Sequence, residues 1–152
     1  MTDNQTSSTT EIQPSNDIEQ GIREYILARQ FNAAVRAGAA IMKIYTIADR
    51  MPHDTIKREL GETRIPILSE EGREMRFDER RNWELFWLVD PLDGTVEFIK
   101  GNNEFTVNIA LMQNNRCVCA IIFVPYHHKI YIAEAGRGSW LIESVMPDEA
   151  PS

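Results

Sequence analysis

The sequence has little of what a membrane-spanning or nucleic-acid-binding protein needs. No apolar run approaches the roughly 18 residues that a membrane-spanning helix requires. Basic residues number 16 against 23 acidic ones, and the formal net charge is −7. That balance argues against binding the phosphate backbone of DNA or RNA, and against an anionic membrane surface. We therefore expect no nucleic-acid polymer and no membrane span among its interactions.

Cysteine is also scarce, since the chain has only Cys117 and Cys119, two positions apart in a segment with strand character. Side chains at that spacing in a strand point to the same face, which is poor geometry for a bond between them. We interpret both as reduced residues in or near the core, which is typical of a cytoplasmic protein. Residues 1–17 are polar and contain no apolar segment of the kind found in secretion signals. We therefore expect a cytoplasmic location.

The sequence does have enough apolar residues for one packed domain. Its 152 residues are 43% hydrophobic and 26% charged, a balance typical of a single globular domain. Residues 1–17 are rich in Ser, Thr, Asn and Gln, and we expect them to form a disordered tail. Residues 18–145 should form the domain, and residues 146–152 a frayed tail.

Two helices should open the domain. Apolar residues recur at helical spacing from about residue 18 to 45, and the small residues 37–40 would let another element approach closely. A second helix should run from about residue 49 to 60, with Gly61 at its C-terminal end. His53 on this helix is expected to be a packed or surface histidine.

An antiparallel sheet is predicted for the rest of the domain. Apolar and polar residues alternate on both sides of a turn at residues 113–115, which predicts a hairpin. The expected strands are 65–69, 85–89, 105–111, 116–124 and 129–135, with a charged surface loop at 73–84 and a closing turn at 136–140.

Two carboxylates lie within the segment Asp90-Pro-Leu-Asp93-Gly-Thr95, where Pro91 and Gly94 should stop the preceding strand and force a turn. Acidic groups this close repel each other unless positive charge lies between them. Mg²⁺ is the obvious candidate, because it takes oxygen ligands from one or two carboxylates together with substrate phosphate. Thr95 is expected to cap a short helix, whose N-terminus favours anions.

Glu70 and Glu71 repeat this arrangement, because they follow the strand 65–69 as Asp90 follows its own strand. Ligands commonly lie beyond the carboxyl ends of strands in open α/β sheets. Taken alone, the two glutamates are most simply a solvated loop. The similarity to the Asp90 turn, in which an acid also follows an apolar strand, is what favours a ligand-binding site here.

These motifs together carry a family resemblance. Ser69-Glu70-Glu71, followed by Asp90-Pro-Leu-Asp93-Gly-Thr95-Val-Glu-Phe98, resembles the Mg²⁺-dependent, lithium-sensitive phosphomonoesterases of the inositol monophosphatase superfamily. The continuation Glu97-Phe98-Ile99-Lys100 and residues 103–111 resemble its CysQ-type 3'(2'),5'-bisphosphate nucleotidase branch. The resemblance covers about residues 20 to 141. It implies an α+β fold, the N-terminal half of the family's layered sugar-phosphatase architecture, with two helices on a largely antiparallel sheet.

The resemblance also implies roles for individual residues. The expected Mg²⁺ ligands are Glu70, Asp90, Asp93 and the backbone carbonyl of Leu92. Thr95 with Glu70 would orient the attacking water, and Asp93 with the amides of Gly94 and Thr95 would bind the substrate phosphate. The implied reaction removes the 3'-phosphate of 3'-phosphoadenosine 5'-phosphate, a small phosphorylated substrate, to give AMP and phosphate.

Three departures from the family pattern leave alternatives open. Val96 stands where the family has a lysine, which is expected to alter substrate preference. Tyr45 runs directly into Thr46, where the family inserts a loop whose acid helps to activate water. Beyond Trp140 the family continues into a second half with a further metal-binding aspartate. The alternatives are a weak or inactive metal-binding fragment that acts through a partner, and an inositol-phosphate phosphatase. A homo-oligomer would be one way to cover an exposed sheet.

Overall fold

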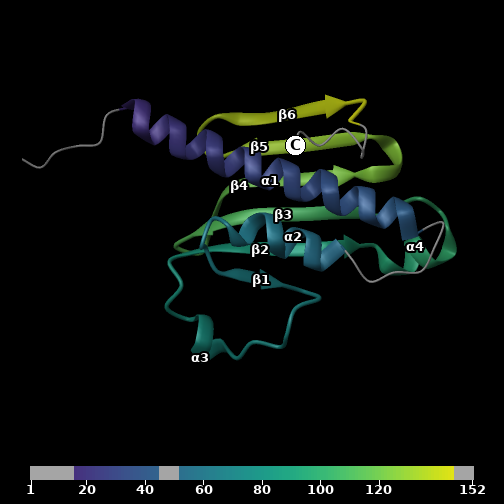
Figure 1. The fold of residues 1–152 in the computed structure, drawn as a ribbon, viewed down its shortest axis with the longest axis horizontal. Coiled ribbons are helices and arrows are strands. Elements are labelled where there is room, and N and C mark those ends of the chain that lie inside the picture. The colour runs from purple at the N-terminus through teal and green to yellow at the C-terminus, as the bar shows by residue number, and fades with distance from the viewer. Residues whose placement is uncertain (1–15, 45–51, 146–152) are drawn as a thin grey trace, which may run out of the picture.

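A six-stranded sheet with two helices over one face forms the fold in a computed structural model, which describes residues 16–44 and 52–145 (Figure 1). The strands follow one another across the sheet in the order β1-β2-β3-β4-β5-β6. Neighbouring strands are antiparallel except β1 and β2, which are parallel. The predicted α+β architecture with a largely antiparallel sheet is therefore confirmed. The predicted tails, apart from residues 16 and 17, lie outside the described residues.

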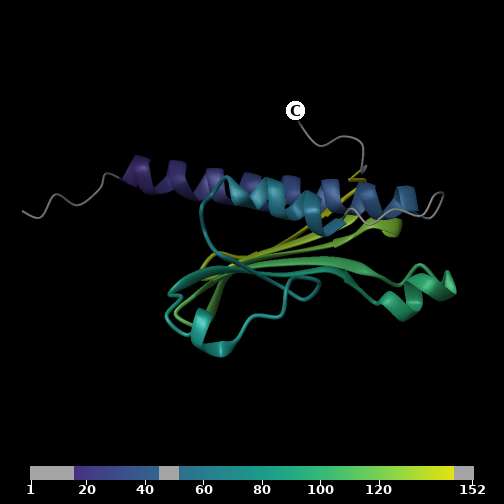
Figure 2. The ribbon, with the colours of Figure 1, turned by 60° about the horizontal axis from the view of Figure 1, so that its bottom comes forward.

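The helices α1 (Asn16–Ile44) and α2 (Pro52–Gly61) lie side by side over the same face of the sheet (Figures 1 and 2). Both predicted helices are confirmed, although α1 begins two residues earlier than expected and the predicted start of α2 lies outside the described residues. The two helices are joined by ion pairs, because the buried carboxylate of Glu59 on α2 lies 3.7 Å from Arg29 and 3.3 Å from Arg36 of α1. Ile56 and Leu60 of α2 are fully buried.

The strands agree with the alternating apolar pattern of the sequence. They are β1 (Ile67–Ser69), β2 (Leu85–Asp93), β3 (Thr106–Gln113), β4 (Arg116–Val124), β5 (Lys129–Glu134) and β6 (Gly138–Glu143). Three short helical segments connect them: α3 (Phe77–Arg80), α4 (Thr95–Lys100) and the 3-10 helix η1 (Pro125–His127). The hairpin predicted around residues 113–115 is confirmed by the antiparallel pairing of β3 with β4.

Alternate strand residues face the helices and form the core, among them Trp87, Ile109 and Phe123, each at most 1% exposed. The opposite side of the sheet, which we call the open face, carries Leu88 at 43% and Ile122 at 42% exposure. Within the described residues no helix is long and apolar enough to cross a membrane. The open face matters because the candidate site lies on it.

Two short elements were not predicted. The segment 73–84 contains α3, where the amide of Arg76 donates to the Glu79 carboxylate at 3.4 Å and the Arg73 guanidinium donates to it at 2.6 Å. Dense charge made this single helical turn resemble a plain loop. The expected closing turn at 136–140 instead leads into the strand β6, all six residues of which are exposed, so no apolar alternation reveals it.

The prediction that Cys117 and Cys119 share a face is wrong. Cys117 is exposed and Cys119 is buried, and both are free thiols. Cys117 pairs with Met112 while Cys119 pairs with Leu111, so β4 holds one extra residue at this point. Such a bulge shifts the alternation by one position and turns the two thiols to opposite sides.

The small residues of α1 do allow a close approach, as Gly38 shows. A Cβ added there would lie 2.1 Å from Cε1 of the fully buried Phe123. Gly38→Ala should therefore lower the free energy of unfolding by about 2 kcal/mol, because overpacking outweighs the gain in helix propensity. Urea denaturation would measure this, with Gly21→Ala as control, since nothing lies within 4 Å of a Cβ at Gly21 and that change should be stabilising. Equal effects at both sites would contradict the close packing.

Candidate functional site

A bulge in β2 brings the two aspartates to the same face of the sheet. Asp90 pairs with Asn108 and Asp93 pairs with Thr106, so β2 advances three residues while β3 advances two. Without the extra residue, Asp90 and Asp93 would point to opposite faces. The prediction that the strand stops at Asp90 is therefore wrong, because Pro91 is accommodated at the bulge, where a missing amide is tolerated.

Glu70 stands beside Asp90 because β1 and β2 run in parallel. Ser69 pairs with Val89, and the Glu70 amide donates to the Val89 carbonyl at 3.0 Å. Burial raises the pKa of Asp90 to about 6, and the hydrogen bond and negative charge of Glu70 act in the same direction. The Leu92 amide opposes this shift by donating to the Asp90 carboxylate at 3.1 Å. Glu70 and Asp90 therefore meet as two close carboxylates, an arrangement that agrees with the shared site implied by the family resemblance.

Asp93 is held by a short polar network on β3. The Asn108 amide group donates to the Asp93 carboxylate at 3.0 Å, and the Thr106 hydroxyl donates to the Asn108 side-chain oxygen at 3.0 Å. Neither Asn108 nor Thr106 is among the site residues predicted from the sequence. Their polar side chains alternate with buried Val107 and are the available signal, but only the strand register places them opposite the two acids.

Gly94, and not Thr95, is the N-cap residue of α4. Gly94 has a left-handed backbone with φ of 91°, and no side-chain hydrogen bond caps the helix. Thr95 is the first helical residue, and its hydroxyl donates to the Leu92 carbonyl at 3.2 Å. The predicted capping role of Thr95 is therefore wrong. The tight turn after Asp93 requires a left-handed residue at the N-cap position, and Gly94 supplies it.

The site offers oxygen donors, but they do not form a closed set. Across the part of the chain that the structure describes, no three His, Cys, Asp or Glu side chains converge on one metal position. Glu70 and Asp90 face each other, whereas Asp93 is bonded to Asn108. Carboxylate and carbonyl oxygens are the donors that hard cations such as Mg²⁺ prefer. The types of residue therefore suit Mg²⁺. Asp93, however, is hydrogen-bonded to Asn108 and does not converge with Glu70 and Asp90 on one metal position in this structure.

A hollow on the open face adjoins the acids. It measures about 570 Å³, and its lining includes Glu70, Asp90 and Asn108 together with apolar residues such as Leu88 and Ile122. Of the other predicted positions, Glu71 is exposed and Val96 is 55% exposed on α4. The acidic side chains form an oxygen-rich cluster at the rim of an apolar surface. Such a cluster is chemically suited to bind a cation together with an anionic ligand such as a phosphate group.

The chain belongs to the inositol monophosphatase family, whose model matches residues 4–151. The family resemblance found in the sequence is therefore confirmed.

The relatives within this family include proteins named 3'(2'),5'-bisphosphate nucleotidase CysQ. The one from Salmonella typhimurium is 39% identical over 123 residues, which is 68% of this chain and 50% of the relative. The one from Haemophilus influenzae is 41% identical over 76 residues, or 50% of this chain and 28% of the relative. The chain thus spans about half the length of the Salmonella relative.

Solved structures show the same fold. The crystal structure of CysQ from Bacteroides thetaiotaomicron matches with a TM-score of 0.70 and 43% identity, covering 78% of this chain and 49% of that one. The extragenic suppressor protein suhB from Bartonella henselae matches with a TM-score of 0.67 and 30% identity, covering 76% of this chain and 50% of that one.

Proposed function

We propose that this chain carries the acidic site of a Mg²⁺-dependent phosphomonoesterase that removes the 3'-phosphate of 3'-phosphoadenosine 5'-phosphate. The observation that carries the proposal is the β2 bulge, which turns Asp90 and Asp93 to the face where Glu70 stands. Support for the substrate comes from relatives named 3'(2'),5'-bisphosphate nucleotidase at 39% identity. Both the activity and the substrate are proposals, because the chain spans 50% of that relative.

Mg²⁺ would be held by the carboxylates of Glu70, Asp90 and Asp93 and by the carbonyl of Leu92. When bound, it supplies positive charge that neutralises the phosphoryl oxygens and lowers the barrier to attack by water. The pKa of Asp90, raised to about 6 by burial and by Glu70, supports this assignment. Two close carboxylates gain stability when a cation replaces their shared proton.

The remaining steps fall to groups at the start of α4. The Thr95 hydroxyl lies 3.2 Å from the Leu92 carbonyl. Together with Glu70 it would orient the attacking water, and the Glu70 carboxylate would accept the proton of that water. The backbone amides of Gly94 and Thr95 would donate hydrogen bonds to the phosphate, since amides at the start of a helix lack helical partners. Asp93 would hold the substrate phosphate indirectly, because it would help to bind the Mg²⁺ that neutralises the phosphate charge.

Substrate choice rests on the residues that follow the acids. The continuation Glu97-Phe98-Ile99-Lys100 favours the nucleotidase branch over an inositol-phosphate phosphatase. Val96 is 55% exposed on the first turn of α4, close in sequence to the proposed phosphate-binding amides. An apolar residue there offers no charge to a second phosphate, so we expect weaker discrimination for bisphosphorylated substrates than a lysine would give.

A second candidate function is metal binding without turnover, through a partner that completes the site. It is favoured by the hydrogen bond from Asn108 to Asp93, which occupies one carboxylate oxygen. The absence of a converging trio of ligands among the described residues points the same way. A cytoplasmic location is inferred from the two free thiols.

Phosphate release with and without Mg²⁺ tests the proposal. The chain should release phosphate from 3'-phosphoadenosine 5'-phosphate faster than from inositol 1-phosphate. Asp93→Asn should lower the rate at least about 100-fold, because a lost metal ligand removes several kcal/mol of charge stabilisation. The exposed neighbour Glu71→Gln is the control and should keep the rate. Mg²⁺ binding without Asp93-dependent turnover on either substrate would support the second candidate and reject the first.

A further inference from the structure

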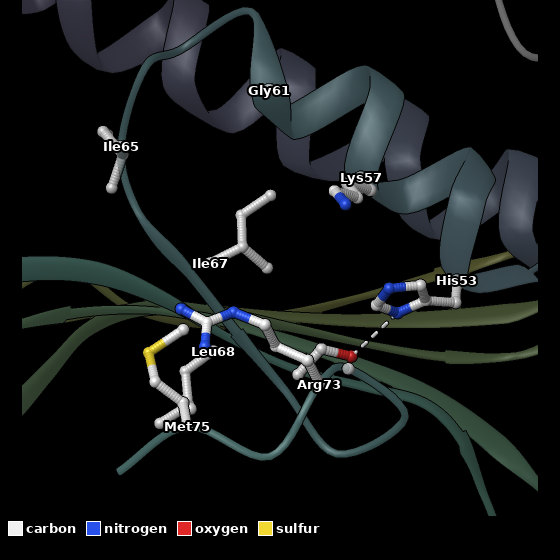
Figure 3. A pocket seen from close by; sticks show the side chains of 10 residues that line it. His53, Lys57, Gly61, Ile65, Ile67, Leu68, Arg73 and Met75 are labelled. Carbon is white, nitrogen blue, oxygen red and sulfur yellow. Dashed lines mark hydrogen bonds between the residues drawn. The ribbon is translucent and has the colours of Figure 1, made fainter. Parts of the chain in front are cut away.

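The strand that leads to Glu70 is weakly held. β1 has three residues and, in the described sheet, pairs only with β2. On its helix side a cavity of about 430 Å³ separates it from α2, lined by Lys57, Ile67 and Arg73 among others (Figure 3). A short edge strand beside a cavity has few packing contacts to fix its position. Its pairing with β2 extends to the Glu70 amide, which donates to the Val89 carbonyl at 3.0 Å, and a contact with α2 would add a second anchor at this end.

One hydrogen bond spans this cavity at the end of the strand next to Glu70. Nδ1 of His53 lies 3.1 Å from the hydroxyl oxygen of Ser69. A dashed line marks this hydrogen bond in Figure 3. His53 is half-buried in the first turn of α2. That helix is anchored by the buried Ile56 and Leu60, so His53 provides a fixed point.

The same imidazole bonds to one end of the turn that carries Glu70 and lies near the other end. Ser69 is the last residue of β1, and its carbonyl accepts a hydrogen bond from the Gly72 amide at 3.1 Å. A Cβ added at Gly72 would lie 3.8 Å from Cε1 of His53. Because side chains alternate along a strand, Ser69 faces α2 while Glu70 faces the open side. A shift of Ser69 would therefore move Glu70 relative to Asp90.

We propose that His53 is a positioning residue, which fixes the turn bearing Glu70 beside Asp90 by holding the Ser69 hydroxyl. It acts through Ser69 and does not touch the acids. The inference deepens the proposed function, because Glu70 is one of the proposed metal ligands. It also gives a role to a histidine that is expected from its sequence context to be merely packed or exposed.

Amide hydrogen exchange of the metal-free chain tests the positioning directly. His53→Phe should speed exchange at the amides of Glu70 and Gly72 about 5- to 10-fold. This is the effect expected when the bond from His53 to Ser69 is lost and the turn opens more often. His53→Asn, which can place a nitrogen near the position of Nδ1, should restore slow exchange. The Trp87 amide, bonded to the Pro66 carbonyl at 2.8 Å at the other end of β1, is the internal control. Unchanged exchange at Glu70 and Gly72 would overturn the proposal.

Calorimetric titration with Mn²⁺ alone gives the second readout. His53→Phe and Ser69→Ala should each weaken Mn²⁺ binding about 10-fold, and the double variant should be no worse than either, since both remove the same bond. The exposed His127→Ala should bind like the parent chain. A merely structural bond would lower the thermal midpoint and leave Mn²⁺ affinity unchanged, which would contradict positioning. If the parent chain binds no Mn²⁺, the proposed metal site fails, and amide exchange still decides the role of His53.

Discussion

Asp90→Asn is expected to stabilise the metal-free chain above about pH 6 while abolishing its response to Mg²⁺. Burial and the neighbouring Glu70 raise the pKa of Asp90 from 3.8 to about 6, so the folded chain holds this proton more tightly than the unfolded chain does. Stability from the group is therefore fully present below about pH 4 and is lost as the pH rises through about 6. Asparagine removes that loss because it has no charge to bury.

A shift of this size corresponds to about 3 kcal/mol, and solvent screening of the half-buried carboxylate reduces the expected gain to about 1–2 kcal/mol. Urea denaturation at pH 4 and pH 8 would measure it. The variant and the parent chain should differ little at pH 4, and the variant should be more stable at pH 8. Asp78→Asn is the control, since the Asp78 side chain is 68% exposed and its ion pair with Arg76 lies at the surface, so it should shift stability by less than about 0.5 kcal/mol at both pH values.

Millimolar Mg²⁺ should reverse the order of the two proteins. A ligand that binds only the folded state raises the free energy of unfolding by an amount that grows with the logarithm of its concentration relative to Kd, so the parent chain should gain stability and Asp90→Asn should not. Thermal unfolding at pH 8 with increasing Mg²⁺ would show this. An equal gain in both proteins would mean that Asp90 is not a ligand. No gain in either would remove the metal from the proposed function.

The sequence predicted the elements whose signals are local. Helical spacing located α1, and apolar alternation located β3, β4 and their hairpin. It also showed that Glu70 and Asp90 each follow an apolar strand, and the family resemblance implied that they share a metal site; the parallel pairing of β1 with β2 is what brings the two carboxylates together. These features depend on residues close in sequence or on a repeated pattern.

The features that the sequence missed depend on register between distant segments. Which face Asp93 occupies is decided by the extra residue opposite Thr106 and Asn108, and no pattern within β2 shows that bulge. Pro91 and Gly94 were interpreted as strand breakers, although a bulge accommodates the proline and the strand continues to Asp93. The contact of His53 with Ser69 joins residues 16 apart on different elements, so spacing alone could not reveal it.

Gly94 is the backbone position on which the second half of the site depends. Its φ of 91° lies in the left-handed region, and a Cβ there would approach the Glu104 carbonyl oxygen to 2.7 Å and the Phe105 Cα to 3.3 Å. Both neighbours are backbone atoms, and Phe105 is buried, so neither can withdraw without moving the start of β3. The turn therefore combines two demands that only glycine meets.

Gly94→Ala should therefore cost about 3–5 kcal/mol of unfolding free energy, from left-handed strain and backbone overlap together. Gly136→Ala is the matched control, because Gly136 has φ of 74° but nothing within 4 Å of an added Cβ, so it should pay only about 1–2 kcal/mol of strain. Urea denaturation separates the two effects. Mn²⁺ titration at low temperature should also show weaker binding for Gly94→Ala alone, since relief of the overlap would move Thr95 from the Leu92 carbonyl that it contacts at 3.2 Å. Equal costs at Gly94 and Gly136 would mean that β3 does not press against this turn, and that its geometry is set by α4 alone.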